Sequence, residues 1–363
     1  MGAIANEYFR LPAPALSVPC MTPVTAPFAL GVFQRGPAAA GPAFTGLVRG
    51  DRVRDVGALG TPNDLLADWD ASFRLLAALA ADTGADWIPL AELDVRCPVA
   101  PAQILQCGAN YRSHVVDLVM AERRAGLSTT GHDSTELEDE VRAWAEAMMD
   151  ERARHGQPYV FTGLPSALTG PNDEIVLPDR GTRHDWELEL AAVIGRPARH
   201  LTRDNALDHV AAYTICNDIT TRSLVYRPDL KAIGTDWFAA KNAPTFLPTG
   251  PWLVPAAFAG DPASLRITLR HNDVVRQDES CADMLFDLPA ILTYITAVTA
   301  LGPGDLVLTG SPAGNGAHWG VFLADGDLVE GEITGLGRQR NHVVGKPAAS
   351  TPAPRDLEEQ PDA

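Results

Sequence analysis

The segment "RHDWELELAAVIG" places acidic residues directly before an apolar run. Asp185, Glu187 and Glu189 occupy every second position. On a β-strand, Glu187 and Glu189 would project from one face, about 7 Å apart at their backbones, while Leu188 and Leu190 face a core. Two carboxylates that approach to about 5 Å repel by roughly 3 kcal/mol at an effective dielectric near 20. We therefore expect a positive charge between them.

A third carboxylate ends the next predicted strand. The run "AAYTICND" finishes at Asp218, and carboxylates from two strands offer the hard oxygen ligands that suit Mg²⁺, Mn²⁺ or Ca²⁺. Mg²⁺ would keep water molecules that a substrate can displace. An isolated E-x-E pair is more often the solvated face of an amphipathic strand, so the pair by itself is a weak signal.

Composition narrows the class of protein. The chain has 363 residues, is 46% hydrophobic and carries a net charge of -17, which argues against nucleic acid or an anionic membrane as the main partner. Its five cysteines are scattered and form no C-x-x-C pair, which predicts a reducing cytoplasm. No secretory signal and no apolar run long enough to span a bilayer is evident.

The remaining patterns predict mostly strands. Residues 1–98 read as a small β-rich region, in which "FTGLVRGDRVRDVG" is a hairpin with a Gly-Asp turn. A buried strand, "QILQCG", then leads into a short helix that carries His114 and Asp117. Further strands and the helix "DLPAILTYITAVTAL" follow, and the tail 346–363 is predicted to be disordered because it has little to bury.

One amphipathic helix is predicted between residues 133 and 156. Leu137, Val141, Trp144 and Met148 fall on one helical face. Gly156 can end this helix.

Seven blocks in a fixed order identify a resemblance. They are "GANYRSHVVD", "PSALTGPNDEIVLP", "DWELELAAVIG", "YTICNDITTRS", "KNAPTFLPTGPWLVP", "LGPGDLVLTGSPAGNG" and "LADGDLVEGEITGLG". Together they resemble the fumarylacetoacetate hydrolase family over residues 103–344, apart from an inserted segment at about 120–158. The resemblance implies an α+β, predominantly β fold, a mixed sheet rolled into a sandwich with few helices.

The resemblance also implies a domain organisation. A catalytic domain would cover residues 99–345 and pair as a homodimer. The inserted segment lies where the family has a lid over the substrate, and it would enlarge that lid or extend a dimer interface.

The resemblance assigns the acidic residues to a metal site. It implies that Glu187, Glu189 and Asp218 hold the metal, with Mg²⁺ or Mn²⁺ expected and Ca²⁺ as a further option, whereas Asp185 is not a ligand. It also implies a water-activating dyad of His114 and Asp117, which would share a helical face at i and i+3. Asp117 stands where a glutamate is usual, and the shorter side chain alters the reach of the dyad.

The resemblance implies a set of substrate-binding residues. Lys241 would bind a carboxylate or enolate and take part in catalysis. The other residues expected to contact the substrate are Arg222, Tyr111, Thr309 and Gly310.

Other positions depart from the family pattern or carry no expected role. The family's F-x-K lysine is absent, since Thr162 and Gly163 lie at the expected place. We expect His184 and His318 to be ordinary surface or core histidines.

The expected function is hydrolysis of a carbon–carbon bond in a 1,3-dicarbonyl such as an acylpyruvate or fumarylacetoacetate-like compound, as occurs in the catabolism of aromatic compounds. A small keto acid or diketone would be the partner. Three non-hydrolytic reactions on the same metal site remain open: decarboxylation of a β-keto acid, isomerisation, and hydration of a 2-oxo-enoate. A non-catalytic ligand-binding protein is a further alternative.

Overall fold

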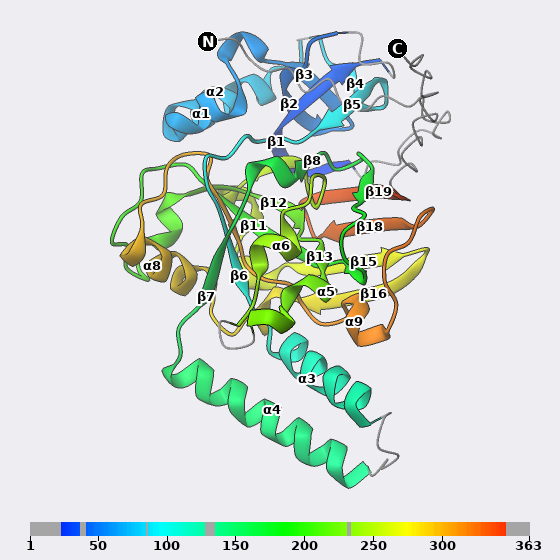
Figure 1. Cartoon of the computed structure of the whole chain (residues 1–363). Coiled ribbons are helices and arrows are strands. Elements are labelled where there is room, and N and C mark those ends of the chain that lie inside the picture. Colours follow the sequence, from blue (N-terminus) through cyan, green and yellow to red (C-terminus); the bar gives the residue numbers. More distant parts are fainter. Residues whose placement is uncertain (1–22, 37–40, 85, 128–134, 231–233, 346–363) are drawn as a thin grey trace, which may run out of the picture.

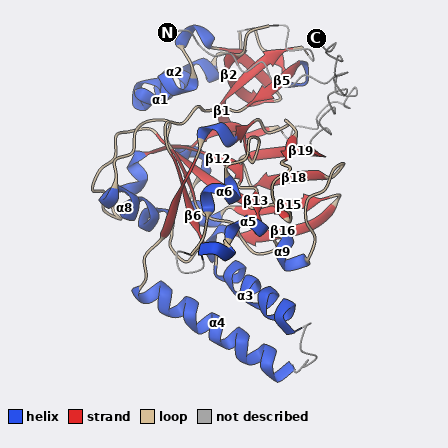
Figure 2. Cartoon of the chain, viewed as in Figure 1, coloured by secondary structure: helices blue, strands red, loops and turns tan. Residues whose placement is uncertain are grey.

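The fold is known from a computed structural model, which describes residues 23–36, 41–84, 86–127, 135–230 and 234–345. The predicted disordered tail, 346–363, lies outside these residues. Strands fill the centre of the molecule and helices lie around them (Figure 2), which confirms the α+β, predominantly β prediction. Within the described ranges, no helix combines the length and apolar character needed to cross a membrane.

The N-terminal region is β-rich, as predicted, but it also contains two helices. Its strands are β1 (Val24–Arg35), β2 (Phe44–Gly50), β3 (Arg52–Asp55), β4 (Ile88–Pro89) and β5 (Leu93–Arg96). β2 and β3 form the predicted hairpin, with Gly50 at a φ of 59°. The helices α1 (Pro62–Ala67) and α2 (Trp69–Ala81) were not predicted, although Thr61 caps the first with a capping box and Asp68 caps the second.

A large sheet runs from this region into the rest of the chain (Figure 1). Its strand order is β4-β3-β2-β1-β14-β12-β11-β17-β6-β7, with β5 paired to β1 and β8 to β14. The strands not yet defined are β6 (Ile104–Gly108), β7 (Tyr159–Gly163), β8 (Leu168–Thr169), β11 (Leu188–Ile194), β12 (Val210–Asn217), β14 (Leu247–Pro255) and β17 (Leu306–Leu308). β11 therefore lies between two neighbours, β12 and β17, in the middle of the sheet.

A second sheet packs against the first and has the order β16-β15-β18-β19-β9. Its strands are β9 (Ile175–Leu177), β15 (Arg266–His271), β16 (Val274–Ser280), β18 (Leu328–Ile333) and β19 (Gly337–Gly345). A short ladder joins β10 (His184–Asp185) to β13 (Thr220–Thr221). The remaining helices are α5 (Arg222–Val225), α6 (Trp237–Lys241), α7 (Ala256–Ala259), α8 (Leu288–Val298) and α9 (Gly316–Trp319).

The predicted alternation along β11 is present. Leu188 and Leu190 are fully buried in the core shared with the second sheet, next to Ile267 and Ile333. At about 25 cal/mol per Å² of apolar surface, each fully buried leucine contributes roughly 2 kcal/mol to folding. The side chains of the alternate residues, among them Glu189, therefore lie on the other face of the strand.

The inserted segment forms a helical hairpin that projects from the body of the molecule (Figure 1). Helix α3 (Arg112–Leu127) is longer than the short helix predicted, and α4 (Thr135–His155) matches its predicted range. An ion pair between Arg112 and Asp150 joins the two helices.

The buried face of α4 differs from the predicted one. Val141, Ala145, Met148 and Met149 pack against α3, whereas Trp144 is 59% exposed. Trp144 was thus wrongly placed on the buried face, because the helical period does not say which stripe a neighbouring helix will cover. The side chain of Leu137 lies outside the described residues.

A buried glutamine fastens the second sheet to the first. Nε2 of Gln339, on β19, donates to the carbonyl oxygens of Ile215, Pro248 and Gly250 at 2.9, 3.1 and 3.1 Å. These carbonyls belong to β12 and β14, where their ladder is irregular. The amide thus joins β19 to both strands where their ladder is irregular, and it gives three backbone carbonyls a buried donor.

Replacing Gln339 with Leu should lower the free energy of unfolding by about 2–3 kcal/mol, because three buried carbonyls lose their donor. Urea unfolding followed by circular dichroism measures this change. Gln157, which is exposed, offers a matched control, since Gln157→Leu should change stability by less than about 0.5 kcal/mol. Equal effects of the two substitutions would contradict this role for Gln339.

Candidate metal and active site

Three carboxylates meet where β11 and β12 lie side by side. Glu187 precedes β11, Glu189 lies on it, and Asp218 follows β12. All three are buried, and one carboxylate oxygen from each lies within 4.8 Å of the others. The antiparallel pairing of β11 with β12 brings them together, and the N–H of Asp218 donates to the carbonyl of Glu187 at 2.8 Å.

Side-chain amides fix the backbone between these carboxylates. Oδ1 of Asn217 accepts the N–H of Glu187 at 2.9 Å, and Oε1 of Gln277 accepts the N–H of Leu188 at 3.1 Å. Gln277 lies on β16 of the second sheet, and its Nε2 donates to Ser311 at 3.0 Å. The second sheet therefore helps to set the position of β11 and of the loop after β17.

Lys241 lies among the carboxylates, where the repulsion between them requires a positive charge. Its Nζ lies 2.7 Å from Oε2 of Glu187, 2.5 Å from Oδ2 of Asp218 and 2.7 Å from Oγ1 of Thr220. Lys241 ends helix α6, whose first turn is capped by Asp236. Burial acts to lower the pKa of Lys241, but Asp218 and Glu187 raise it above its usual value, so the ammonium stays charged.

Arg222 is the second cation of the cluster. Its Nη2 lies 2.5 Å from Oε1 of Glu187, and its Nε lies 2.7 Å from Oδ2 of Asp185. Asp185 also accepts the backbone N–H groups of Gly316 and Ala317. Asp185 thus anchors helix α9 to the cluster, and the guanidinium of Arg222 holds Glu187 in place.

The charges of the cluster do not balance. Four buried carboxylates, those of Asp185, Glu187, Glu189 and Asp218, face two cations, Lys241 and Arg222. With all four carboxylates ionised, two negative charges would be left over, which is the charge that a divalent cation neutralises.

The pKa values of the three carboxylates differ accordingly. Burial raises the pKa of Asp218 to about 6, with Lys241 acting against it. Burial and then repulsion by Asp218 hold the pKa of Glu189 well above its usual range. Burial acts in the same direction on Glu187, but Arg222 and Lys241 lower its pKa below the usual range. Ionisation of Glu189 and Asp218 is thus unfavourable until a cation is bound between them.

The donor set fits a hard divalent cation. Oδ1 of Asp218 is buried and has no hydrogen-bond partner among the described residues. Oε2 of Glu189 accepts the N–H of Gly310 at 2.8 Å, which leaves its other oxygen for a ligand. Three carboxylates without histidine or thiolate favour Mg²⁺ or Mn²⁺ over softer metals.

His114 reaches this cluster from helix α3. The imidazole is buried, and its Nε2 lies 3.8 Å from Oε1 of Glu187. Burial lowers the pKa of His114 to about 4, although Glu187 acts in the opposite direction. The ring is therefore uncharged at neutral pH and can accept a proton.

The structure gives Asp117 a different partner from the one expected. Nδ1 of His114 has no hydrogen-bond partner among the described residues, whereas Oδ2 of Asp117 lies 3.2 Å from Nδ1 of His318 on α9. The hydrogen-bonded dyad implied by the resemblance is thus not formed here. His318, for which we expected no role in the site, lies at the edge of the site. The only sequence signal for this position is that His318 closely follows a glycine-rich loop.

The loop after β17 contributes backbone groups. Gly310 donates its N–H to Glu189, and its φ of 97° suits glycine. The hydroxyl of Thr309 donates to the carbonyl of Leu190 at 3.0 Å. Tyr111 is fully buried, and its hydroxyl has no hydrogen-bond partner among the described residues. Substrate contacts by these residues and by Arg222 stay a prediction.

Amide side chains were the main omission of the sequence reasoning. Asn110, directly before Tyr111, accepts the N–H of Phe286 at 3.0 Å and donates to the carbonyls of Phe286 and Thr309 at 3.0 and 2.8 Å. Asn110 thus ties the turn before α3 to the loop after β17.

Comparisons with known proteins show which family the chain belongs to. Residues 103–344 match the family described as "Fumarylacetoacetate (FAA) hydrolase C-terminal". A 2,4-didehydro-3-deoxy-L-rhamnonate hydrolase of Sphingomonas sp. (strain SKA58) is 34% identical over 74% of this chain and 84% of its own. A mitochondrial oxaloacetate tautomerase of Homo sapiens is 37% identical over 52% of this chain and 59% of its own.

Solved structures agree in fold. Fumarylacetoacetate hydrolase from Exiguobacterium antarcticum superposes with a TM-score of 0.67 at 27% identity, covering 88% of this chain and 100% of its own. Maleylpyruvate hydrolase from Sphingobium sp. SYK-6, in complex with manganese(II) ion and pyruvate, superposes with a TM-score of 0.64 at 28% identity. That alignment covers 87% of this chain and 99% of the other.

Glu189→Gln should separate metal binding from folding. The amide keeps an acceptor for Gly310 but removes a buried ionisable group. The metal-free variant should therefore be more stable than the metal-free wild type by about 1 kcal/mol, and its Tm should be higher. Wild type should gain about 2–3 kcal/mol from Mg²⁺ or Mn²⁺ at a hundredfold excess over Kd, and the variant should lose most of that gain. Differential scanning fluorimetry with and without metal measures both effects.

Glu92→Gln is the matched control, because Glu92 is exposed. This substitution should change neither the Tm of the metal-free protein nor the stabilisation that the metal gives. A full metal-dependent gain in Glu189→Gln would remove Glu189 from the ligand set.

Proposed function

Because the chain belongs to the fumarylacetoacetate hydrolase family and is an enzyme, we propose that it hydrolyses a carbon–carbon bond of a 1,3-dicarbonyl acid with a bound divalent cation. The observation that carries the proposal is the buried carboxylate triad beside a neutral histidine and a charged lysine. The preferred substrate is an acylpyruvate, whose keto-acid end offers two oxygens to a cation.

The metal would be held by Glu187, Glu189 and Asp218. Mg²⁺ or Mn²⁺ would supply Lewis-acid polarisation of the substrate's oxygens. Arg222 keeps Glu187 ionised and oriented through their 2.5 Å contact. Burial of the whole cluster excludes bulk water, which strengthens each of these electrostatic interactions.

His114 would act as the base. Its pKa of about 4, lowered by burial, leaves the imidazole free to accept a proton at neutral pH. A water molecule deprotonated by His114 would attack the distal carbonyl carbon. The oxygen–carbon bond forms as the bond from that carbon to the neighbouring methylene breaks.

Lys241 would stabilise the negative charge that this cleavage creates. The electron pair of the broken bond passes into the enolate of pyruvate, and the charged ammonium of Lys241, held by Glu187 and Asp218, lies in the cluster that would bind it. Protonation of the enolate carbon gives pyruvate, and the acyl group leaves as a carboxylic acid. Atoms balance with one water consumed.

Relatives support both the substrate class and the cation. The hydrolase from Sphingomonas is named for a 3-deoxy acid oxidised at C2 and C4, which places two carbonyls one carbon apart. The maleylpyruvate hydrolase was solved with manganese and pyruvate. Mn²⁺ is therefore the first alternative to Mg²⁺. The homodimer and the cytoplasmic location remain predictions.

Proton transfer without hydrolysis is the second candidate. The unpartnered Nδ1 of His114 and the pairing of Asp117 with His318 leave the water-activating dyad incomplete. The tautomerase relative of Homo sapiens acts, by its name, on oxaloacetate. A keto–enol tautomerisation would use the same cation, His114 and Lys241, but no attacking water.

Metal removal should abolish turnover. Wild type treated with EDTA and the variant Glu187→Ala should each lose at least about 10²–10³-fold in kcat on an acylpyruvate, because both remove the polarising cation. Absorbance of the enolised diketone measures the rate, and added Mg²⁺ or Mn²⁺ should rescue only the EDTA-treated wild type. Full activity in either case would overturn the metal assignment.

His114→Ala should abolish hydrolysis but keep metal affinity, because His114 is not a ligand. We expect a loss of about 10²–10⁴-fold in kcat, typical for removal of a general base, with Mg²⁺ affinity by isothermal titration calorimetry changed by less than about threefold. Product analysis by NMR on an acylpyruvate and on oxaloacetate distinguishes the two candidate reactions. An unchanged hydrolysis rate would exclude His114 as the base.

A further inference from the structure

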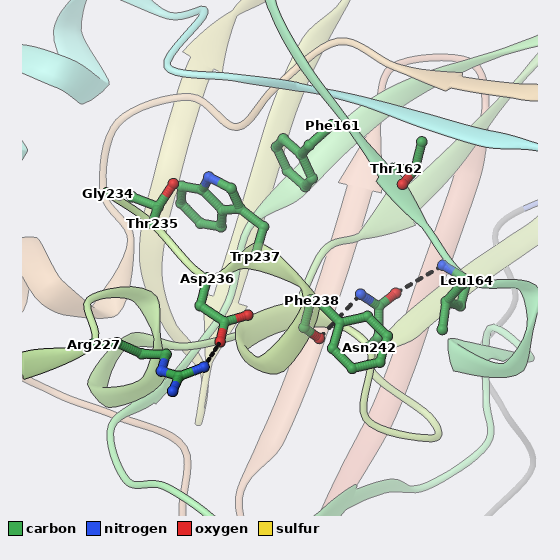
Figure 3. A pocket seen from close by; sticks show the side chains of 10 residues that line it. All are labelled: Phe161, Thr162, Leu164, Arg227, Gly234, Thr235, Asp236, Trp237, Phe238 and Asn242. Atoms are coloured by element: carbon green, nitrogen blue, oxygen red, sulfur yellow. Dashed lines mark hydrogen bonds and ion pairs between the residues drawn. The ribbon is translucent and has the colours of Figure 1, made fainter. Parts of the chain in front are cut away.

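A hollow lined by aromatic rings is shown in Figure 3. Its lining includes none of the four carboxylates of the cluster, but Nζ of Lys241 lies close to the rings of Phe161 and Trp237. The hollow has a volume of about 450 Å³ and is lined by residues of β7, of α6 and of the segments before α6, among them Phe161, Trp237 and Phe238. Small-molecule sites usually measure about 300–1,000 Å³ and are mostly apolar. The hollow is thus large enough for part of a substrate.

Two stacked rings form the side of the hollow that lies nearest to Lys241. Phe161 and Trp237 lie 5.1 Å apart at their centroids with an interplanar angle of 15°. Nζ of Lys241 lies 5.6 Å from each centroid. The other directions around Nζ are taken by Glu187, Asp218 and Thr220, so a group that extends outward past Lys241 meets these two rings.

The stack is held in place before any ligand binds. Nε1 of Trp237 donates to the hydroxyl of Tyr159 at 2.5 Å, and Tyr159 in turn lies 3.4 Å from the hydroxyl of Thr235. The amide of Asn242 is also engaged, since it accepts from Leu164 and donates to Phe238. The polar groups around the rings are thus mostly satisfied by one another.

The hollow offers little attraction to a second carboxylate. Arg227 is its lining arginine among the described residues, and it is paired with Asp229 at 2.6 Å and with Asp236 at 3.6 Å (Figure 3). Gly163, next to Thr162 on β7, lies near the place where the family pattern has a lysine. Among the described residues that line the hollow, an anionic end of a substrate would therefore meet acidic groups and no unpaired cation.

On the basis of the proposed function, we infer that Phe161 and Trp237 select substrates whose acyl group is uncharged and planar, such as an aroylpyruvate. The keto-acid end would lie at the carboxylate cluster and the ring of the acyl group against the stack. Offset stacking on preorganised aromatic rings favours a flat π-system over a short alkyl group. The enzyme would then discriminate against acylpyruvates that end in a second carboxylate.

The test compares three 2,4-dioxo acids with Mg²⁺ present: 4-phenyl-2,4-dioxobutanoate, 2,4-dioxopentanoate, and an acylpyruvate with a terminal carboxylate. Wild type should have a kcat/KM for the phenyl compound at least about tenfold above that for the carboxylate-ended one. Phe161→Ala and Trp237→Ala should each lower kcat/KM for the phenyl compound about tenfold, and for 2,4-dioxopentanoate less than about threefold. Trp237→Phe should retain most of the preference.

Trp87→Ala is the control, because the Trp87 ring packs under Arg49 in the N-terminal region. This substitution should leave kcat/KM for all three substrates unchanged. A wild-type preference for the carboxylate-ended substrate, or equal losses on the phenyl and methyl compounds in both alanine variants, would overturn the inference but not the proposed function. If Trp237→Ala does not fold, Phe161→Ala and Trp237→Phe decide the outcome. Absence of turnover of all three acids by metal-loaded wild type would overturn both.

Discussion

Burial of several carboxylates in one small volume is the constraint to which the rest of this structure responds. An ionised carboxylate out of water is costly unless it is paired and hydrogen-bonded. Glu187 meets this cost with two cations, Lys241 and Arg222. Glu189 receives one backbone N–H, and Asp218 keeps one oxygen without a partner. The cluster would therefore be neutralised by another positive charge, and this is what makes it a candidate cation site.

Holding such groups together requires rigid support, which comes from both sheets. β11 lies between two neighbours of the large sheet, and Gln277 from the second sheet fixes its first residue. Asp185 links the same cluster to α9, and α9 meets helix α3 through His318 and Asp117. β11, the loop after β17 and helix α3, which carries His114, are thus connected by hydrogen bonds and ion pairs rather than by apolar packing alone.

The sequence was informative where structure is local. The alternation of Glu187 and Glu189 with leucines predicted two faces of one strand, and the family pattern identified the acidic triad. Gln277 and Gln339 could not be found in this way, because their partners are far along the chain and any surface glutamine looks the same. The caps at Thr61 and Asp68 were readable signals for α1 and α2, but the Pro- and Ala-rich surroundings hid them. The partner of Asp117 depends on how α9 packs, which no local pattern encodes.

The position of β1 has a consequence for how the chain can be divided. β1 lies between β2 and β14, and its Phe28 and Leu30 share a hydrophobic cluster with Leu253 of β14. Cutting the chain before residue 99 would therefore remove β1 from the edge of β14, where β8 pairs only with Leu247 and Pro248, and would expose an apolar surface. Such edges recruit strands from other molecules. We expect the family-matching segment to aggregate when expressed alone, which would make the N-terminal region necessary for its solubility.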